Sequence, residues 1–156
     1  MDERTLVIVK PDGVTRGLSG EVVRRIERTG LRLIGTKMVR VTRGFAEKHY
    51  RHDDIARRHG ERVWEMLLVY LMEGPVLAAV FQGPNAVSVV RKLVGATEPN
   101  AASPGTVRGD FGYTSATFCN SNHQPIRNIV HASATVEEAT AEVSLWFNND
   151  ELFAGG

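Results

Sequence analysis

Apolar residues in this chain gather in short runs that turn-forming residues separate. The run Thr5-Leu6-Val7-Ile8-Val9 is rich in β-branched residues and stops before Pro11, which also favours an extended Lys10. A short uninterrupted apolar run is typical of a strand buried on both faces. We therefore expect a buried strand over residues 5–9 with Lys10 at its end.

The following segment predicts a helix and a second strand. Beyond the turn-forming Asp12-Gly13, Ser19 can cap a helix that Gly30 can end in a left-handed conformation. The apolar positions of this helix share one face: Val22, Val23 and Ile26. Residues 31–41 then return as a strand whose pattern slips near Gly35, which indicates a bulge.

The middle of the chain predicts a long helical region, a strand and another helix. Residues 45–71 read as mostly helical, with an inward stripe formed by Trp64, Leu67, Leu68 and Leu71. Gly74-Pro75 breaks that pattern before a buried strand over residues 76–81. Asn85 can cap the next helix, which ends near Gly95.

The last third begins with a long irregular stretch over residues 96–127, which is rich in Gly, Pro, Ser, Thr and Asn. A loop of this length in a small domain is usually functional or disordered, and we expect a functional one. Ile129-Val130 predicts a short strand. Thr135 and Glu138 fit a capping box that opens a helix with core-facing Val136, Ala139, Val143 and Trp146.

The element order is therefore β-α-β-α-β-α-β-α. It predicts the α+β class, with a ferredoxin-like four-stranded antiparallel sheet and helices covering one face. We expect a single domain over residues 1–156, because no linker or internal repeat divides the chain.

Composition and charge narrow the possible functions. Nineteen basic and eighteen acidic residues leave a formal charge of +1, so the bulk field that membrane or nucleic-acid binding usually requires is missing. The single cysteine, Cys119, cannot form an internal disulfide, and the charged start lacks a signal-peptide pattern. No apolar run approaches the roughly 20 residues that a membrane span needs. We therefore expect a cytoplasmic protein without membrane or specific nucleic-acid partners.

Candidate chemistry centres on His131, which follows the last strand and precedes the last helix. An isolated histidine here would most often be structural. Four other polar residues also lie near element ends and could converge to neutralise and orient phosphate oxygens: Lys10, Arg91, Arg108 and Asn128. Scattered surface charge is the alternative explanation.

Several sequence blocks strengthen the phosphate hypothesis because they resemble the signature blocks of nucleoside diphosphate kinases, in the order of that family. The resemblance covers residues 4–152 and rests on 9–14, 16–17, 20–21, 49–50, 74–76, 95–97, 104–111 and 128–133. It implies an enzyme that transfers the γ-phosphate of a nucleoside triphosphate, typically ATP, to a nucleoside diphosphate. The mechanism implied is ping-pong, with a phosphohistidine at His131.

The same resemblance assigns roles to individual residues. It makes Nδ1 of His131 the nucleophile, with Glu142 and Ser133 orienting the ring and Tyr50 nearby. Lys10 and Asn128 match the residues that contact the ribose 3′ hydroxyl, and Lys10 also reaches the transferring phosphate. The matching phosphate ligands are Arg91, Thr97 and Arg108.

The resemblance also implies cofactors and partners. Mg²⁺ arrives bound to the nucleotide, so no metal site built by the protein is expected. Relatives form homo-oligomers, tetramers or hexamers, and we expect a hexamer here.

Three features depart from the family pattern. Ala134 stands where most members carry aspartate, so Thr135 is expected to cap the helix. The segment that supplies a base-stacking phenylalanine is altered, which places Val63 at the stacking position and Trp64 beside it. Either Trp64 supplies the platform or the stack is missing, and Trp64 on such a stripe is more often a core residue. The link over residues 113–126 is longer than usual.

Other functions are compatible with parts of the sequence. A ferredoxin-like sheet can bind single-stranded RNA through surface aromatics, but the strands here lack them. An inactive relative is conceivable because of Ala134 and the altered stacking segment, although the candidate site residues are all present. Zinc at Cys119, His123 and the remaining histidines (His49, His52 and His59) is disfavoured, because such histidines are generally solvated.

Overall fold

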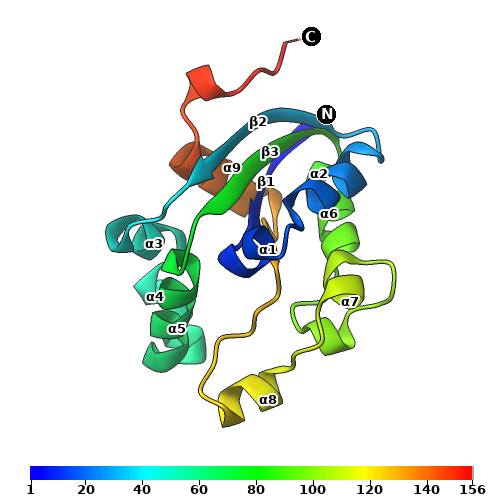
Figure 1. Ribbon diagram of the computed structural model, residues 1–156. Helices are drawn as coiled ribbons and strands as arrows, with labels where there is room; N and C mark the ends of the chain where they lie inside the picture. The colour runs from blue at the N-terminus through cyan, green and yellow to red at the C-terminus, as the bar shows by residue number, and fades with distance from the viewer. Residues whose placement is uncertain (156) are drawn as a thin grey trace.

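The computed structural model describes residues 1–155 and contains one four-stranded antiparallel sheet with the strand order β2-β3-β1-β4 (Figure 1). Its strands are β1 (Asp2–Val9), β2 (Arg32–Val39), β3 (Val76–Pro84) and β4 (Val130–Ala132). All three pairings are antiparallel. The predicted ferredoxin-like α+β fold is therefore confirmed.

Strand β1 lies inside the sheet between β3 and β4, and its side chains are buried on both faces. Leu6 and Ile8 belong to one core, whereas Val7 and Val9 belong to the other. Alternate side chains of a strand point to opposite faces, so burial on both faces requires apolar residues at successive positions. This explains the uninterrupted apolar run, as inferred from the sequence. Where β1 ends, Ile8 pairs with His131 of β4.

The helices cover both faces of the sheet, so the expectation of helices on one face only was wrong. One core packs the sheet against α3 (Arg43–His49), α4 (His52–His59), α5 (Glu61–Met72) and α9 (Val136–Trp146). The other packs it against α2 (Ser19–Glu27) and α6 (Ala86–Val94). Helices therefore cover much of both faces, although β2 keeps exposed positions such as Met38.

The region predicted to be mostly helical consists of three helices, α3, α4 and α5. Tyr50 and Arg51 leave the helical conformation between the first two, and Gly60 separates the next two with φ 93°. A further short helix, α1 (Pro11–Thr15), replaces the expected turn at Asp12-Gly13. Proline suits the first turn of a helix, since its missing N–H has no partner there in any case.

Residues 96–127 are more ordered than their composition suggests. They contain the 3₁₀ turn η1 (Pro99–Ala101), α7 (Val107–Phe111) and α8 (Ala116–Ser121). Side chains cap both helices: Thr106 accepts from Gly109 N, and Ser115 accepts from Phe118 N. A second 3₁₀ turn, η2 (Asn149–Glu151), follows α9.

The predicted helix boundaries are confirmed only in part. Ser19 does not cap α2, because Leu18 is the N-cap residue, Ser19 is the first helical residue, and no side chain caps this helix. Gly30 and Gly95 follow α2 and α6 with φ values of 94° and 89°, a region that glycine enters without a Cβ clash. Strand β2 has the expected bulge between Leu33 and Gly35. Asn85 does precede α6, but its side chain makes no cap bond.

The start of α9 differs in two details from its prediction. Thr135 caps the helix as expected by accepting from Glu138 N at 3.1 Å. The Glu138 carboxylate, however, accepts from Ala134 N at 2.6 Å, so the capping box is only half formed. Val136 is 45% exposed and does not face the core, whereas Ala139, Val143 and Trp146 are buried.

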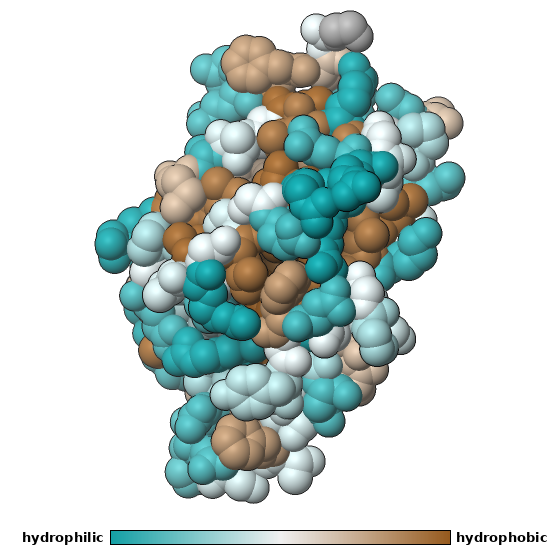
Figure 2. Space-filling view, turned by 45° about the vertical axis from the view of Figure 1, so that its right-hand side comes forward, coloured by the Kyte–Doolittle hydropathy of each residue, from teal (hydrophilic) through white to brown (hydrophobic). Residues whose placement is uncertain are grey.

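The surface mixes polar and apolar groups. In the view of Figure 2, brown apolar side chains gather across the middle of the molecule, and teal polar side chains surround them. Among residues 1–155, each helix falls short of the length and apolarity that crossing a membrane demands.

Candidate active site

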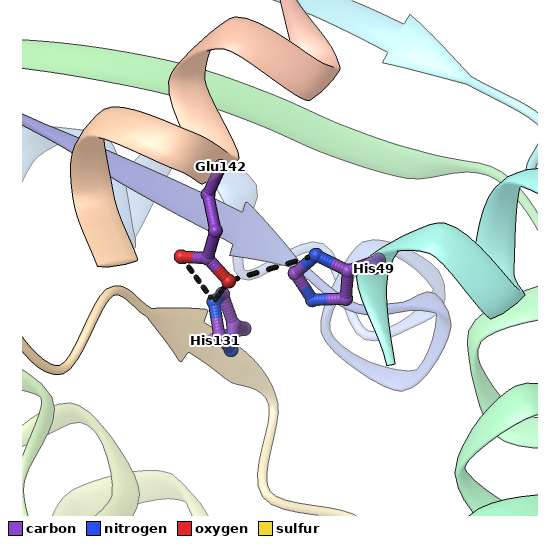
Figure 3. Close-up of side chains that lie close together, drawn as sticks. All are labelled: His49, His131 and Glu142. Atoms are coloured by element: carbon purple, nitrogen blue, oxygen red, sulfur yellow. Dashed lines mark hydrogen bonds and ion pairs between the residues drawn. The ribbon is translucent and has the colours of Figure 1, made fainter. Parts of the chain in front are cut away.

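His131 lies within β4, rather than after the last strand as the sequence suggested, and its side chain is 16% exposed. Its Nε2 atom lies 2.8 Å and 3.0 Å from the two carboxylate oxygens of Glu142, which comes from α9. Figure 3 shows this carboxylate directed toward the rings of both His131 and His49. An acceptor-only carboxylate at Nε2 places the ring proton there, so Nδ1 of neutral His131 keeps its lone pair.

Glu142 is itself fixed by neighbouring side chains. The Ser133 hydroxyl donates to Oε1 of Glu142 at 2.6 Å, and Ser133 is completely buried. Nδ1 of His49 lies 3.6 Å from Oε2 of Glu142 and accepts a 3.1 Å hydrogen bond from Trp146 Nε1. Ser133, Glu142 and His131 thus form a continuous hydrogen-bonded chain.

Burial sets the charge state of this chain. Loss of solvent lowers the pKa of His131 to about 3, and the positive charges of Lys10, Arg108 and Arg91 act in the same direction. Burial also raises the pKa of Glu142, while His49 and Ser133 oppose that shift. His131 is therefore neutral near pH 7, as a nitrogen nucleophile must be.

Lys10 and Asn128 meet beside the histidine. Lys10 is 5% exposed, and its Nζ donates to Asn128 Oδ1 at 2.9 Å. Asn128 Nδ2 in turn donates to the backbone oxygen of Thr97 at 3.0 Å. Burial, reinforced by Arg108 and opposed by Asp12, lowers the pKa of Lys10 to about 7. This ammonium group would therefore gain strongly from an anionic ligand.

Two arginines complete the positive charge. Arg108 of α7 is 4% exposed and donates to the backbone oxygens of Asn128, Val130 and Gly95 at 3.1, 2.6 and 3.2 Å. Burial and then Arg91 lower its pKa to about 10. Arg91 of α6 donates to the Ala132 oxygen, next to His131, at 3.3 Å.

The chain just before His131 adopts a tight turn that the sequence did not indicate. Ile129 has φ 72°, which is rare for a β-branched residue, and Val130 N donates to Asn128 O at 2.7 Å across it. Asp12 helps to hold the turn, because its Oδ2 accepts from Ile129 N at 3.2 Å while Oδ1 accepts from the Tyr70 hydroxyl. Ile129 therefore lies outside β4, although it was predicted to be part of the strand.

A cavity of about 310 Å³ adjoins these polar groups. Lys10, Thr97 and Asn128 line one end, and Val63 and other residues of α5 line a wall. Trp64 does not line this cavity.

Trp64 instead packs in the core on one face of the sheet. Trp64 is 8% exposed, and its Nε1 donates to the backbone oxygen of Tyr50 at 2.7 Å. The ring of Tyr50 contacts His49, with 4.5 Å between centroids, and His49 contacts His131 at 4.7 Å. The structure thus brings together every predicted site residue except Trp64, which has the placement of a core residue.

Hydrogen bonding accounts for the one group of potential metal ligands in the described part of the chain. His49, His131 and Glu142 place their ligand atoms within 4.8 Å of one another. Nε2 of His131 is engaged by Glu142, and Nδ1 of His49 accepts a hydrogen bond from Trp146. Cys119 is buried, and His123 contacts Arg62 instead.

A family model described as nucleoside diphosphate kinase matches residues 3–152. The chain belongs to the nucleoside diphosphate kinase family. The nucleoside diphosphate kinase of Borreliella burgdorferi is 48% identical over 150 residues, which cover 96% of this chain and 90% of that protein. The chain is accordingly a nucleotide-binding phosphotransferase.

Solved structures agree with this assignment. One, described as a transition state mimic of the Borrelia burgdorferi kinase with bound vanadate and ADP, is 46% identical with a TM-score of 0.96. The match covers 99% of this chain and 92% of the Borrelia burgdorferi chain. The Halobacterium salinarum kinase in complex with CDP is 37% identical with a TM-score of 0.85, matching 100% and 94% of the two chains.

Sequence reasoning missed several supporting residues of this nucleoside diphosphate kinase site. His49 was considered only as a ligand of a disfavoured zinc site. Its position beside Tyr50 in a family block could have indicated a place in the active site. Asp12 was interpreted as a turn former, and Tyr70 lay outside the predicted inward stripe of α5. In the structure, Asp12 and Tyr70 support the turn at Ile129.

Proposed function

We propose that this enzyme moves the γ-phosphate of a nucleoside triphosphate onto a nucleoside diphosphate through phosphorylated Nδ1 of His131. The observation that carries the proposal is the contact of Nε2 with Glu142, at 2.8 Å to the nearer oxygen, which leaves Nδ1 as the nucleophilic atom. Donor and acceptor then use one site in turn, which is a ping-pong mechanism.

In the first step, the Nδ1 lone pair attacks the γ-phosphorus in line. The bond between that phosphorus and the β,γ-bridging oxygen breaks, and the nucleoside diphosphate leaves with the electron pair. The imidazole becomes cationic, and the adjacent Glu142 carboxylate stabilises that charge. In the second step, a β-phosphate oxygen of another diphosphate attacks the phosphorus, the P–N bond breaks, and neutral His131 is restored.

The surrounding cations would hold the phosphates. Arg91 and Arg108 approach His131 from α6 and α7, and both influence its pKa. Arg108 has five N–H donors, of which three bind backbone oxygens, so further donors remain for phosphate. We assign Lys10 and Asn128 to the ribose 3′ hydroxyl, Lys10 also to the transferring phosphate, and Thr97 to the phosphate chain.

The donor set at this site suits a Mg²⁺ ion carried by the nucleotide rather than by the protein. Mg²⁺ prefers carboxylate, phosphate and water oxygens. Two carboxylates beside the site are engaged, Asp12 by Tyr70 and Ile129 and Glu142 by Ser133 and His131. When bound, the ion would neutralise phosphate charge that Lys10 and the arginines do not reach.

One experiment tests the proposed mechanism directly. The protein is incubated with [γ-³²P]ATP, and label that survives alkali but is lost in acid is expected on His131. Adding unlabelled GDP should move that label onto GTP. Absence of labelled protein in an active preparation would overturn the phosphohistidine route.

We also propose that the chain forms a homo-oligomer. Large apolar side chains are exposed on β2 and beyond α9, among them Met38 at 54% and Phe153 at 76%. Groups of this kind are commonly covered by subunit contacts. Light scattering behind size exclusion should give a mass several times that of one chain, and a monomer mass would contradict this proposal.

A further inference from the structure

The left-handed turn at Ile129, termed here the Ile129 turn, lies between two residues that the proposed function needs. Asn128 directly precedes Ile129, and His131 follows two positions later. The hydrogen bond from Val130 N to Asn128 O closes the turn. A β-branched residue keeps a φ of 72° only where its surroundings impose it. The contacts that impose this turn therefore also set where Asn128 and His131 lie.

One carboxylate connects the Ile129 turn to two helices. Asp12, in the first turn of α1, accepts from Ile129 N through Oδ2 at 3.2 Å. Its other oxygen, Oδ1, accepts from the hydroxyl of Tyr70 on α5. Tyr70 is 1% exposed, so this hydroxyl depends on Asp12 rather than on bulk water for its acceptor. The Asp12 carboxylate thus ties α1 and α5 to the turn.

Helix α1 is packed against the turn without room to shift. A Cβ at Gly13 would lie 3.0 Å from both Cγ2 and the backbone oxygen of Ile129, and 2.8 Å from Cγ1 of Val9. Only glycine allows the backbone of α1 to come this close. Just before α1, Lys10 N donates to the Ile129 oxygen at 2.8 Å. Asp12 therefore reaches Ile129 N from a backbone that is itself held in place.

Tyr70 is held as firmly on the α5 side. Lys10 Nζ lies 4.9 Å from the centroid of the Tyr70 ring, and the guanidinium of Arg127 lies 5.4 Å from it. Arg127, which precedes Asn128, also pairs with Glu73 just past the end of α5. The Tyr70 side chain thus contacts the site residue Lys10 and the chain leading into the turn, as well as Asp12.

We propose that Asp12 and Tyr70 are positioning residues for phosphate transfer, which act through the Ile129 turn on Asn128 and His131. In this role neither side chain needs to touch the nucleotide. The inference rests on the proposed function, because that function assigns the reacting atom to His131 and a ribose contact to Asn128.

Positioning of this kind affects the rate more than the binding of nucleotide. A loosened turn would let Nδ1 of His131 leave the line of attack, and a misplacement of about 1 Å can slow a reaction about 100-fold. Arg91, Arg108 and the wall of α5, which would bind the nucleotide, come from other elements. The rate of phosphorylation should therefore fall while nucleotide affinity changes little.

The charge of Asp12 offers an alternative explanation for any loss of rate. Burial and Arg108 lower the pKa of Lys10 to about 7, and the Asp12 carboxylate opposes that shift. Asp12→Asn separates the charge from the hydrogen bonds. An amide removes the charge, but its oxygen can still accept from Ile129 N and its NH₂ group can donate to the Tyr70 hydroxyl oxygen.

The test measures single-turnover labelling of His131 by saturating [γ-³²P]ATP at pH 7 on the full chain, together with the dissociation constant of ADP. Tyr70→Phe and Asp12→Ala should each slow labelling by about 10- to 100-fold. Their ADP dissociation constants should change by less than about threefold. The double variant should be little slower than the slower single variant, because the two side chains act as one unit. Asp12→Asn should restore labelling to within about threefold of the wild type.

Tyr113→Phe and Asp53→Ala are the matched controls, because Tyr113 is 81% exposed and the Asp53 side chain is 68% exposed. Both should label at the wild-type rate. Melting curves identify the variants that fold, and Tyr70→Phe with Asp12→Asn decides the matter if Asp12→Ala does not.

Three results would overturn positioning. The first is a wild-type labelling rate in folded Tyr70→Phe. The second is a loss of ADP affinity as large as the loss of rate. The third is an Asp12→Asn protein as slow as Tyr70→Phe, which would assign the effect to the charge of Asp12.

Steady-state transfer from ATP to GDP on the same preparations separates this inference from the proposed function. If the wild type transfers phosphate without carrying label, the phosphohistidine mechanism fails, and the transfer rates of the variants still test positioning. If wild-type His131 is labelled and the variants are unaffected, only the positioning inference fails.

Discussion

The two ends of the proposed nucleotide cavity are built differently. At the phosphate end, Lys10, Arg108 and Asn128 are each at most 5% exposed and are held by hydrogen bonds. At the opposite end, termed here the base end, Asn120 and Gln124 are exposed and their amides lack partners within residues 1–155. The proposed phosphate end is therefore preorganised, whereas the polar groups at the other end are not fixed by the protein.

This difference has an energetic meaning. Charged groups held in a buried site stabilise a transition state without reorganising, and the left-handed Ile129 is a backbone distortion tolerated for that geometry. Contacts at an exposed mouth contribute to binding alone. Substitutions at the phosphate end should therefore affect the rate, and those at the base end should affect affinity.

The largest expected effect is that of His131→Ala. It should remove protein labelling and phosphate transfer completely, because the covalent intermediate needs Nδ1. The melting temperature should change little. His52→Ala is the control, since His52 has an exposed imidazole and should keep full activity. Transfer above a trace by a folded His131→Ala protein would defeat the histidine route.

Substituting Arg91 and Arg108 tests how much each contributes to phosphate transfer. Arg108→Ala and Arg91→Ala should each slow transfer by about 10²- to 10³-fold, as expected for one lost charged contact in a preorganised site. Arg108→Ala should also lower the unfolding free energy by about 1–3 kcal/mol, since three backbone oxygens lose their donor. Denaturation and single-turnover labelling measure the two effects, and a threefold or smaller rate change would show that these arginines do not bind the transferring phosphate.

Neighbouring residues of α5 test the boundary between the core and the base end. Trp64→Ala should lower stability by about 3–5 kcal/mol and leave the ADP affinity of the folded protein unchanged, because Trp64 packs in the core. Val63→Ala should do the reverse, with a small loss of stability and weaker ADP binding. If Trp64→Ala instead kept the melting temperature and weakened ADP binding, the Trp64 ring would contact the nucleotide rather than the core.

The helix geometry explains why the sequence could not decide between these two residues. Helix α5 is apolar around much of its circumference. Val63 and Leu67, four residues apart, line the cavity, while Trp64 and Leu68, one position further on, face the core. A stripe of apolar residues indicates burial, but it does not say whether protein or ligand covers the side chain.

Other parts of the fold were predictable to the extent that local chemistry determines them. The both-face burial of β1 and the Thr135 cap follow from local patterns, and both are confirmed. The same burial of β1 already required cover on both sheet faces, an implication that the one-face expectation overlooked. The turn at Ile129 was unpredictable, because β-branched residues favour strands and only Asp12, Lys10 and Arg108, distant in sequence, impose it.

The smallest effect concerns the charge of Lys10, at the proposed phosphate end. Its pKa is lowered to about 7 in the free protein, mainly by burial, whereas an unfolded lysine titrates near 10.5. Between those values the unfolded chain binds more protons, so this residue makes stability rise with pH from about 7 upward. A bound diphosphate favours the ammonium form and should restore the proton. ADP affinity should therefore fall on the order of 50-fold between pH 7 and 9, opposite in sign to stability.

Calorimetry at pH 8 in two buffers of different ionisation enthalpy measures the proton that ADP brings to Lys10. Uptake of nearly one proton is expected for the wild type, because most of its Lys10 is neutral at that pH and His131, with its pKa lowered to about 3, does not titrate there. Lys10→Gln removes the group, so its ADP binding should take up almost none. Equal uptake by both proteins would assign the proton elsewhere and leave Lys10 charged in the free site, which would mean that the phosphate end holds its positive charge without a ligand.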